Sequence, residues 1–314
     1  MSNHFKLFTR TAGLFLGGMG LAAAGVGAFY VMWPEKAPRN RFEREGTFAP
    51  QQFLEIYDRV AEIYDKEVLA EERKIGASEL RRRMMSYVGD SDSVLEVAAG
   101  TGRNNVLYPE TANVLLTDAS REMLRLLRNS TLFRKNLRVA QLDVSSEEAT
   151  RQFAERARNG EFDRHAIVQD DSEREQRESP FREFDCVVSS FLLCSVANPQ
   201  QALDNAVSLC RPGGRLLFLE HGRSGSAWSL VRSVLDQILD RRAVAHARQW
   251  GCWFNRDVAD LLRKHPQLRV DEYQQCWFGH VHMVVATKVD PSASHSASRA
   301  EPVEPTKNVD NVTE

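Results

Sequence analysis

The residues with the clearest chemical meaning lie in one short loop near the middle of the chain. An apolar run at 93–98 contains Glu96 and leads into Ala99-Gly100-Thr101-Gly102. Small residues between a strand and a helix let a ligand approach the backbone, whose free N–H groups point towards it. Asp118 follows twenty-two residues after Glu96, at the end of the next apolar run. An acid at that place in a doubly wound fold accepts hydrogen bonds from a ribose diol.

Each of these features alone would also fit ordinary packing or a helix cap, but together they indicate an adenosine-type ligand across the first two strands. The glycine spacing argues against a dinucleotide. That fingerprint requires G-x-G-x-x-G, and Asn105 stands where its third glycine belongs. The pattern is instead Glu96-x-Ala98-x-Gly100-x-Gly102.

The elements that must position this loop alternate between strands and helices. Helical patterns, for example at 120–128 and 199–210, separate the apolar runs, and Ser120 is a suitable cap for the first of them. Such alternation predicts a parallel sheet with helices on both faces. After it, two extended runs are separated by little more than Phe278-Gly279, which permits only an antiparallel hairpin. The predicted fold is therefore α/β, a doubly wound, Rossmann-like, seven-stranded sheet that ends in an antiparallel hairpin. Its expected strands are 93–98, 113–117, 137–142, 185–190, 215–219, 268–277 and 280–288.

With these motifs in place, residues 57–288 resemble the class I S-adenosylmethionine-dependent methyltransferases, whose sheet also ends in a hairpin. Arg211-Pro212-Gly213-Gly214 before the fifth strand is a further match, whereas Ala98 replaces a glycine that the family usually has. The resemblance implies S-adenosylmethionine as cofactor, with Asp118 on the ribose, Met123 near the adenine and Asp143 on the adenine amino group. The full set of implied cofactor-binding residues is Glu96, Ala98, Gly100, Gly102, Asp118, Ala119, Met123, Leu142, Asp143, Ser189 and Ser190.

Narrower resemblances point to the methyl acceptor. The segments 192–196, 219–221 and 251–256 resemble membrane-anchored thiol methyltransferases and a fungal mitochondrial inner-membrane methyltransferase-like protein, and 57–65 resembles ubiquinone and menaquinone methyltransferases. They imply a small acceptor such as a hydrophobic thiol or a quinone, and a mitochondrial inner membrane location, with the endoplasmic reticulum as the alternative. A second function stays open, that of a cofactor-binding mitochondrial assembly factor whose catalysis is vestigial or dispensable.

Nucleic acid is not an expected partner. The 41 Lys and Arg residues against 43 Asp and Glu give a formal charge of −2, without the basic excess of a DNA-coating protein. Ser189-Ser190-Phe191-Leu192 stands where methyltransferases that act on base amino groups have an Asn/Asp-Pro-Pro-aromatic tetrapeptide.

His221 is the candidate general base, because it follows the fifth strand and is expected at the mouth of the pocket. A hydrogen bond to a neighbouring loop is the alternative role for it. The five cysteines form no C-x-x-C pair, so we expect no metal site and find no base partner for a catalytic thiol. Cys186 and Cys210 fit the core, whereas Cys194 and Cys252 are candidates for the pocket wall.

The ends of the chain differ from its middle. Residues 11–33 carry no charge, and a helix of that length would be roughly 35 Å long, enough for a ~30 Å hydrocarbon core. Gly13 and Gly17 form a small-xxx-small pair that suits a partner helix. A cleaved signal peptide is the alternative, although the run is long for one. Four basic residues follow the run and two precede it, which favours the large domain on the cytosolic or matrix side.

The predicted organisation follows from these segments. An N-terminal flank at 1–10 precedes a single-pass transmembrane helix at 11–33 and a linker at 34–56. The methyltransferase domain occupies 57–288, with a charged surface insertion at about 161–183. The tail at 289–314 has no aromatic residue and no apolar periodicity, which is typical of disorder.

Overall fold

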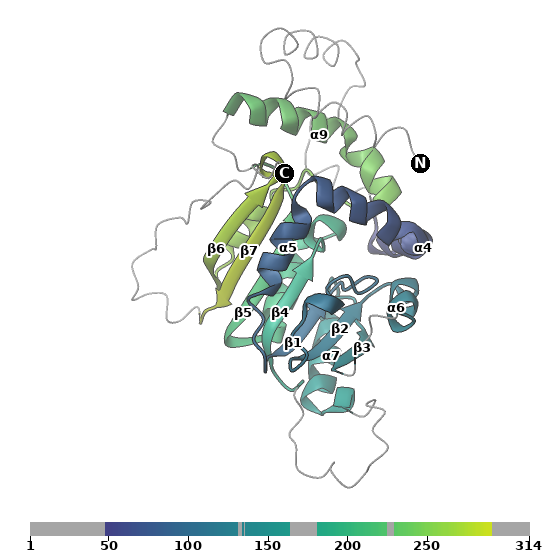
Figure 1. Ribbon diagram of the computed structural model, residues 1–314, viewed down its shortest axis with the longest axis vertical. Helices are drawn as coiled ribbons and strands as arrows, with labels where there is room; N and C mark the ends of the chain where they lie inside the picture. Colours follow the sequence, from purple (N-terminus) through teal and green to yellow (C-terminus); the bar gives the residue numbers. More distant parts are fainter. Residues whose placement is uncertain (1–47, 131–133, 135, 164–180, 225–228, 291–314) are drawn as a thin grey trace.

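The computed structural model describes residues 48–130, 134, 136–163, 181–224 and 229–290 (Figure 1). Several predicted segments lie outside this part: the flank, the span at 11–33 with Gly13 and Gly17, most of the linker, the centre of the insertion, and the tail from 291 onward. Within the described ranges, no helix has both the length and the apolar character needed to cross a lipid bilayer.

The core of the molecule is one seven-stranded sheet, as predicted, in the order β3-β2-β1-β4-β5-β7-β6. The pairs β3/β2, β2/β1, β1/β4 and β4/β5 are parallel, and β7 lies antiparallel to both β5 and β6. The C-terminal hairpin is thereby confirmed. The strands are β1 (Ser93–Val97), β2 (Asn113–Asp118), β3 (Leu137–Gln141), β4 (Phe184–Ser190), β5 (Cys210–His221), β6 (Leu268–Cys276) and β7 (Val281–Lys288).

The fifth strand begins earlier than its sequence pattern predicts. Cys210 already pairs with Phe184, but the next registered pair joins Arg215 to Cys186. Pro212 has no N–H to donate, and Gly213 has a φ of +73°, so the residues between the two pairs leave the ladder. The regular part of the strand therefore starts at Arg215, which is also the first residue of the predicted strand 215–219.

Helices cover both faces of the sheet. The helices are α4 (Pro50–Lys74), α5 (Ala77–Met85), α6 (Arg121–Arg128), α7 (Glu147–Arg158), α8 (Pro199–Leu209), α9 (Ser229–Trp250) and α10 (Val258–Lys264). Ser120 caps α6 as predicted, because its Oγ accepts the Met123 N–H at 3.1 Å. Successive β1 residues alternate between two hydrophobic cores, Val94 with α5 on one side and Leu95 with α7, α8 and α10 on the other.

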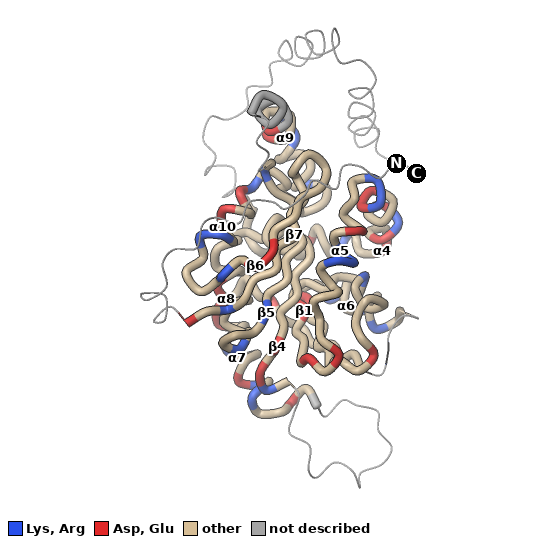
Figure 2. Tube along the Cα trace, turned by 60° about the vertical axis from the view of Figure 1, so that its left-hand side comes forward, with Lys and Arg blue, Asp and Glu red and all other residues tan. Residues whose placement is uncertain are grey.

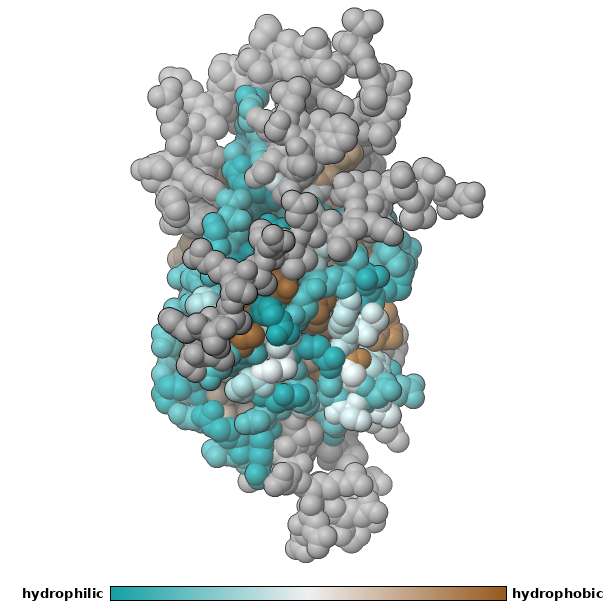
Figure 3. All heavy atoms as spheres, turned by 90° about the vertical axis from the view of Figure 1, so that its left-hand side faces the viewer, coloured by the Kyte–Doolittle hydropathy of each residue, from teal (hydrophilic) through white to brown (hydrophobic). Residues whose placement is uncertain are grey.

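Charged side chains of both signs are interspersed over the helices, and the strands between them are mostly uncharged (Figure 2). In the face that Figure 3 presents, the described surface is largely hydrophilic with separate apolar spots. Among the residues whose exposure the structure describes, the large apolar side chains that are exposed lie apart from one another in the chain: Ile63, Leu69, Val106 and Phe278.

Candidate cofactor and acceptor site

An open cavity of about 1000 Å³, including solvent at its mouth, lies where β1, β2 and β4 end. The strand ends and their loops form one wall, and α4 with the loop after β4 forms the other. Nine of the predicted cofactor residues line it: Glu96, Ala98, Gly100, Asp118, Ala119, Met123, Leu142, Asp143 and Ser190. The structure thus brings together residues from four separate strand ends.

The loop after β1 is shaped by backbone that favours glycine. Gly100 has a φ of +57°, and a Cβ added there would meet nothing within 4 Å, which leaves room for a ligand. Gly102 has a φ of +86°, and a Cβ there would overlap Leu127 and come within 2.5 Å of Asn105 Nδ2. Gly102 therefore packs the loop against α6 and does not itself line the cavity. Ala98 also takes a positive φ, +55°, at the position where the family usually has glycine.

The Asp118 carboxylate is fixed by two backbone donors. The Gly100 N–H donates to Oδ2 and the Ser120 N–H donates to Oδ1, each at 2.8 Å. Burial raises the pKa of Asp118 to about 6, and these N–H groups limit the rise because they stabilise the charged form. Each oxygen keeps a lone pair for a further donor. The carboxylate can therefore accept two ribose hydroxyl groups.

Glu96 is more deeply enclosed, with 1% of its surface exposed. Its Oε1 accepts from Asn104 Nδ2 at 2.8 Å, and its Oε2 accepts from the Tyr108 hydroxyl at 2.6 Å. Burial raises the pKa of Glu96 to about 7, against the effect of these two hydrogen bonds. Glu96 thus ties the end of β1 to the loop that follows.

A buried ionic cluster beside Glu96 was not visible in the sequence. Glu72 of α4 accepts from both Arg81 of α5 and Arg103 of the β1 loop, with the shortest distance 2.7 Å in each pair. Arg81 also donates to Asn104 Oδ1 at 2.8 Å and to Ser190 Oγ at 3.2 Å. The two guanidinium groups share the Glu72 carboxylate at the cavity wall, and Arg103 also lies 3.9 Å from Asp65, so the charges of the cluster balance one another. No local motif marks these residues, because they come from three separate segments.

The loop after β4 is held by Glu220 of β5. Its carboxylate accepts the backbone N–H groups of Leu192 and Leu193 at 3.0 Å and of Cys194 at 3.3 Å. Ser189, predicted as a cofactor contact, is fully buried behind the cavity wall, with its Oγ 3.4 Å from Glu220. Burial raises the pKa of Glu220 well above its ordinary value, and the backbone N–H groups oppose that effect.

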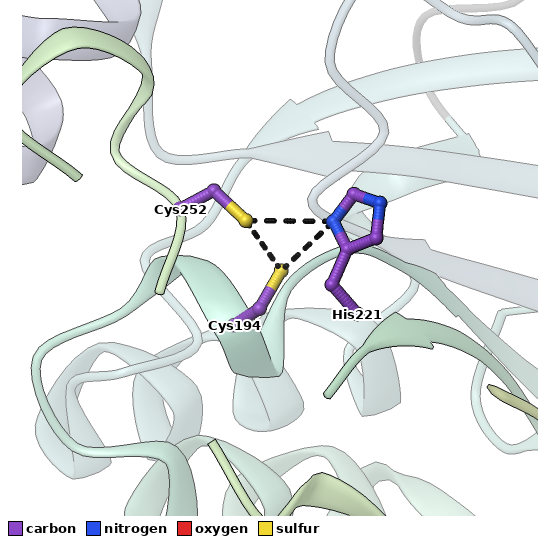
Figure 4. A group of neighbouring side chains, drawn as sticks. All are labelled: Cys194, His221 and Cys252. Carbon is purple, nitrogen blue, oxygen red and sulfur yellow. Dashed lines mark hydrogen bonds between the residues drawn. The ribbon is translucent and has the colours of Figure 1, made fainter. Parts of the chain in front are cut away.

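The residues that line the cavity do not include His221. Its ring stacks on Phe191, which does line the cavity, with centroids 4.2 Å apart. Its Nδ1 faces two thiols, at 3.4 Å from Cys252 Sγ and 3.9 Å from Cys194 Sγ (Figure 4). The expectation that no base lies beside a cysteine is therefore wrong, because the fold brings together three segments that are far apart in the chain. The role of His221 as a general base stays a prediction.

The sheet order, the glycine loop after β1 and the fixed acid after β2 define the nucleotide-binding side of a class I methyltransferase. The methyltransferase domain family matches residues 69–273, and the chain belongs to this family. The matched range contains the motifs that predicted S-adenosylmethionine as the cofactor, from Glu96 to Gly102 and at Asp118. The residues fit this cofactor, because Gly100 leaves open space beside the fixed Asp118 carboxylate.

Three relatives show how far the similarity extends. "Methyltransferase OMS1, mitochondrial" of Saccharomyces cerevisiae is 30% identical over 213 residues, which cover 66% of this chain and 40% of the relative. "Thiol S-methyltransferase TMT1A" of Homo sapiens is 26% identical over 178 residues, 55% of this chain and 60% of the relative. The ubiquinone/menaquinone biosynthesis C-methyltransferase UbiE of Pseudomonas savastanoi is 30% identical over 230 residues, 69% and 76% respectively. The chain thus spans less than two thirds of the first two relatives.

Proposed function

We propose that this protein transfers a methyl group to a small hydrophobic acceptor, such as a thiol or a quinol-type carbon or oxygen, while anchored to a membrane. The observation that carries the proposal is the composition of the cavity wall opposite the cofactor residues. That wall is formed by α4 and the loop after β4, and its side chains are mostly apolar or aromatic: Phe53, Leu54, Tyr57, Tyr64, Phe191, Leu192, Val196 and Ala197.

The chemistry asks little of the protein beyond alignment and exclusion of water. S-adenosylmethionine supplies, when bound, a methyl group on a sulfonium that is already a good leaving group. The cavity walls must hold the nucleophile about 3–3.5 Å from the methyl carbon and in line with the bond that breaks. Burial raises the pKa of Tyr64 and of Tyr57, so both phenols stay neutral and present aromatic surface to the acceptor. Apolar walls of this kind favour an uncharged, hydrophobic acceptor.

The membrane anchor is part of the proposal and rests on the uncharged run at 11–33. Pro50 and Phe53, near the start of α4, line the cavity. Even fully extended, the residues between the run and Pro50 span no more than about 60 Å at ~3.5 Å each. The cavity would therefore stay within reach of apolar compounds that partition into the bilayer. The mitochondrial inner membrane is the proposed location, supported by the mitochondrial relative, and Gly13 with Gly17 the proposed contact for a partner helix.

The test is a calorimetric titration of the full-length protein with S-adenosylmethionine, followed by assays with alkyl thiols and reduced quinones. We expect saturable cofactor binding and methyl transfer to at least one of these acceptors. Absence of binding at millimolar cofactor contradicts the proposal. Binding without transfer to any acceptor favours the cofactor-binding assembly factor instead. Nucleic acid is not a proposed substrate, so an RNA control should receive no methyl group.

A further inference from the structure

Two thiols and an imidazole converge at the end of β5. Cys194 lies in the 3-10 helix Leu193–Ser195 after β4, His221 is the last residue of β5, and Cys252 follows α9. The sulfur atoms lie 3.5 Å apart, and His221 Nδ1 is 3.4 Å from one and 3.9 Å from the other (Figure 4). Cys194 is fully buried, and Cys252 has 7% of its surface exposed.

These distances match one face of a metal-centred tetrahedron. With metal–sulfur bonds of about 2.3 Å and a metal–nitrogen bond of about 2.0–2.1 Å, tetrahedral geometry places the sulfurs about 3.8 Å apart and each sulfur about 3.6 Å from the nitrogen. The observed edges are 3.5, 3.4 and 3.9 Å. Each edge thus needs to change by no more than about 0.3 Å to hold a zinc-sized ion.

The surrounding backbone fixes the three donors relative to one another. The Glu220 carboxylate accepts the Cys194 N–H, and the Trp253 N–H donates to the Cys194 carbonyl at 2.6 Å, which joins the Cys252 segment to the Cys194 segment. Phe191 supports the imidazole by stacking. The donors are therefore held in place by bonds that do not depend on an ion, which lowers the cost of ordering a binding site.

We propose that Cys194, Cys252 and His221 bind a thiophilic divalent cation of the Zn²⁺ class, contrary to the expectation from cysteine spacing. Binding would release both thiol protons to solvent, so two thiolates and one dication form a site without net charge. A neutral complex suits this buried position, since an unpaired charge there would be costly. Among the described residues, the group contains no fourth Cys, His, Asp or Glu ligand. The fourth position would thus belong to water or to another external donor, as in sites that keep an open coordination place.

The experiment uses the full-length protein, stripped with a chelator and kept reduced. Titration with Co²⁺ should produce the thiolate-to-cobalt charge-transfer absorption of a tetrahedral site, saturating at one ion per chain, and Zn²⁺ should abolish it. Cys194→Ser, Cys252→Ser and His221→Ala should each weaken Co²⁺ binding by more than the roughly 10–100-fold that outer-shell changes cost. Cys210→Ser is the matched control, because Cys210 is also buried but lies at the opposite end of β5, and it should bind as the wild type does.

Circular dichroism shows whether a variant that binds less Co²⁺ is still folded. If a serine variant does not fold, His221→Ala still tests the site, because it removes one ligand and keeps both thiols. The proposal is overturned if the reduced wild-type protein shows no charge-transfer band, or if the band survives in both serine variants. Recovery of a Cys194–Cys252 disulfide from protein that takes up no metal after reduction also overturns it, in favour of a redox pair. The titration contains no methyl donor, so its result is independent of the proposed methyl transfer.

Discussion

Replacing Asp118 by Asn tests the assignment of the ribose site most directly. Both carboxylate oxygens accept backbone N–H groups, from Gly100 and Ser120 at 2.8 Å. An Asn side chain has only one oxygen, so one backbone donor would face an amide NH₂ group in either orientation. An unsatisfied buried N–H costs about 1–3 kcal/mol of unfolding free energy. The variant should still fold, with a lower midpoint in urea.

The loss of cofactor affinity should be separable from this loss of stability. A hydrogen bond to a charged acceptor contributes about 1–1.5 kcal/mol more than one to a neutral acceptor, so two ribose hydroxyls should lose about 2–3 kcal/mol. That corresponds to a Kd for S-adenosylmethionine about 30–150-fold weaker, measured by calorimetry. Asp185→Asn is the matched control, because Asp185 also accepts a backbone N–H at 2.8 Å, from Ser93, but lies near the start of β4 and away from the cavity.

The control variant should lose stability and keep the wild-type Kd. An Asp118→Asn protein that is folded and binds S-adenosylmethionine with wild-type affinity would refute the placement of the ribose. Equal weakening in both variants would show that affinity follows general stability, which would also refute it.

Three further predictions concern the parts that hold the site. Gly102→Ala should lower the unfolding free energy by about 2–4 kcal/mol, because the new methyl group overlaps a leucine of α6 and the residue keeps a positive φ; urea denaturation measures it. Burial raises the pKa of Glu96 in the folded state to about 7, so between pH 4.5 and 7 the folded state keeps a proton that the unfolded state has lost. The unfolding free energy should therefore fall as pH rises from about 4.5 to 7, and the fall should be shallower in Glu96→Gln when both are measured across that range. Arg81→Met leaves the buried Glu72 with one fewer partner and should cost up to about 3–5 kcal/mol, whereas Arg82→Met, which removes a pair exposed to solvent, should cost no more than about 1 kcal/mol; equal costs would contradict the role of the buried cluster.

The cofactor half of the site could be predicted from sequence because its residues are local. The first strand, the turn after it and the end of the next strand all lie within a short stretch of sequence. The spacing from Glu96 to Gly102 and on to Asp118 therefore already places these residues at one edge of a parallel sheet. Gly102 and Ser189, predicted by the same reasoning to bind the cofactor, are not among the residues that line the cavity, and their contact with the cofactor stays a prediction. A spacing pattern does not reveal that one glycine packs against α6 or that one serine turns towards Glu220.

The non-local half could not be predicted for a related reason. Arg81 and Glu72 have ordinary helical surroundings in the sequence, and only the packing of α4 on α5 makes their charges buried and paired. Likewise the whole of α8, β5 and α9 lies between Cys194 and Cys252 in the chain, so their spacing gives no sign that both reach His221. Contacts between such distant residues depend on how the strands and helices are connected and packed. No short motif in the sequence records that arrangement.

Helix α4 connects the two halves of the site. Its Asp58 accepts from the Ser120 hydroxyl at 2.5 Å, beside the ribose acid, and its Asp65 accepts from the Thr101 hydroxyl at 2.7 Å, in the glycine loop. The same helix supplies Tyr57 to the acceptor wall. A helix bonded to both cofactor loops cannot leave the acceptor wall without breaking those bonds, so the contacts that close the cofactor side also close the acceptor side. Methyl transfer from a sulfonium requires exclusion of water. Because α4 covers both the cofactor side and the acceptor side of the cavity, this one helix can exclude water from both.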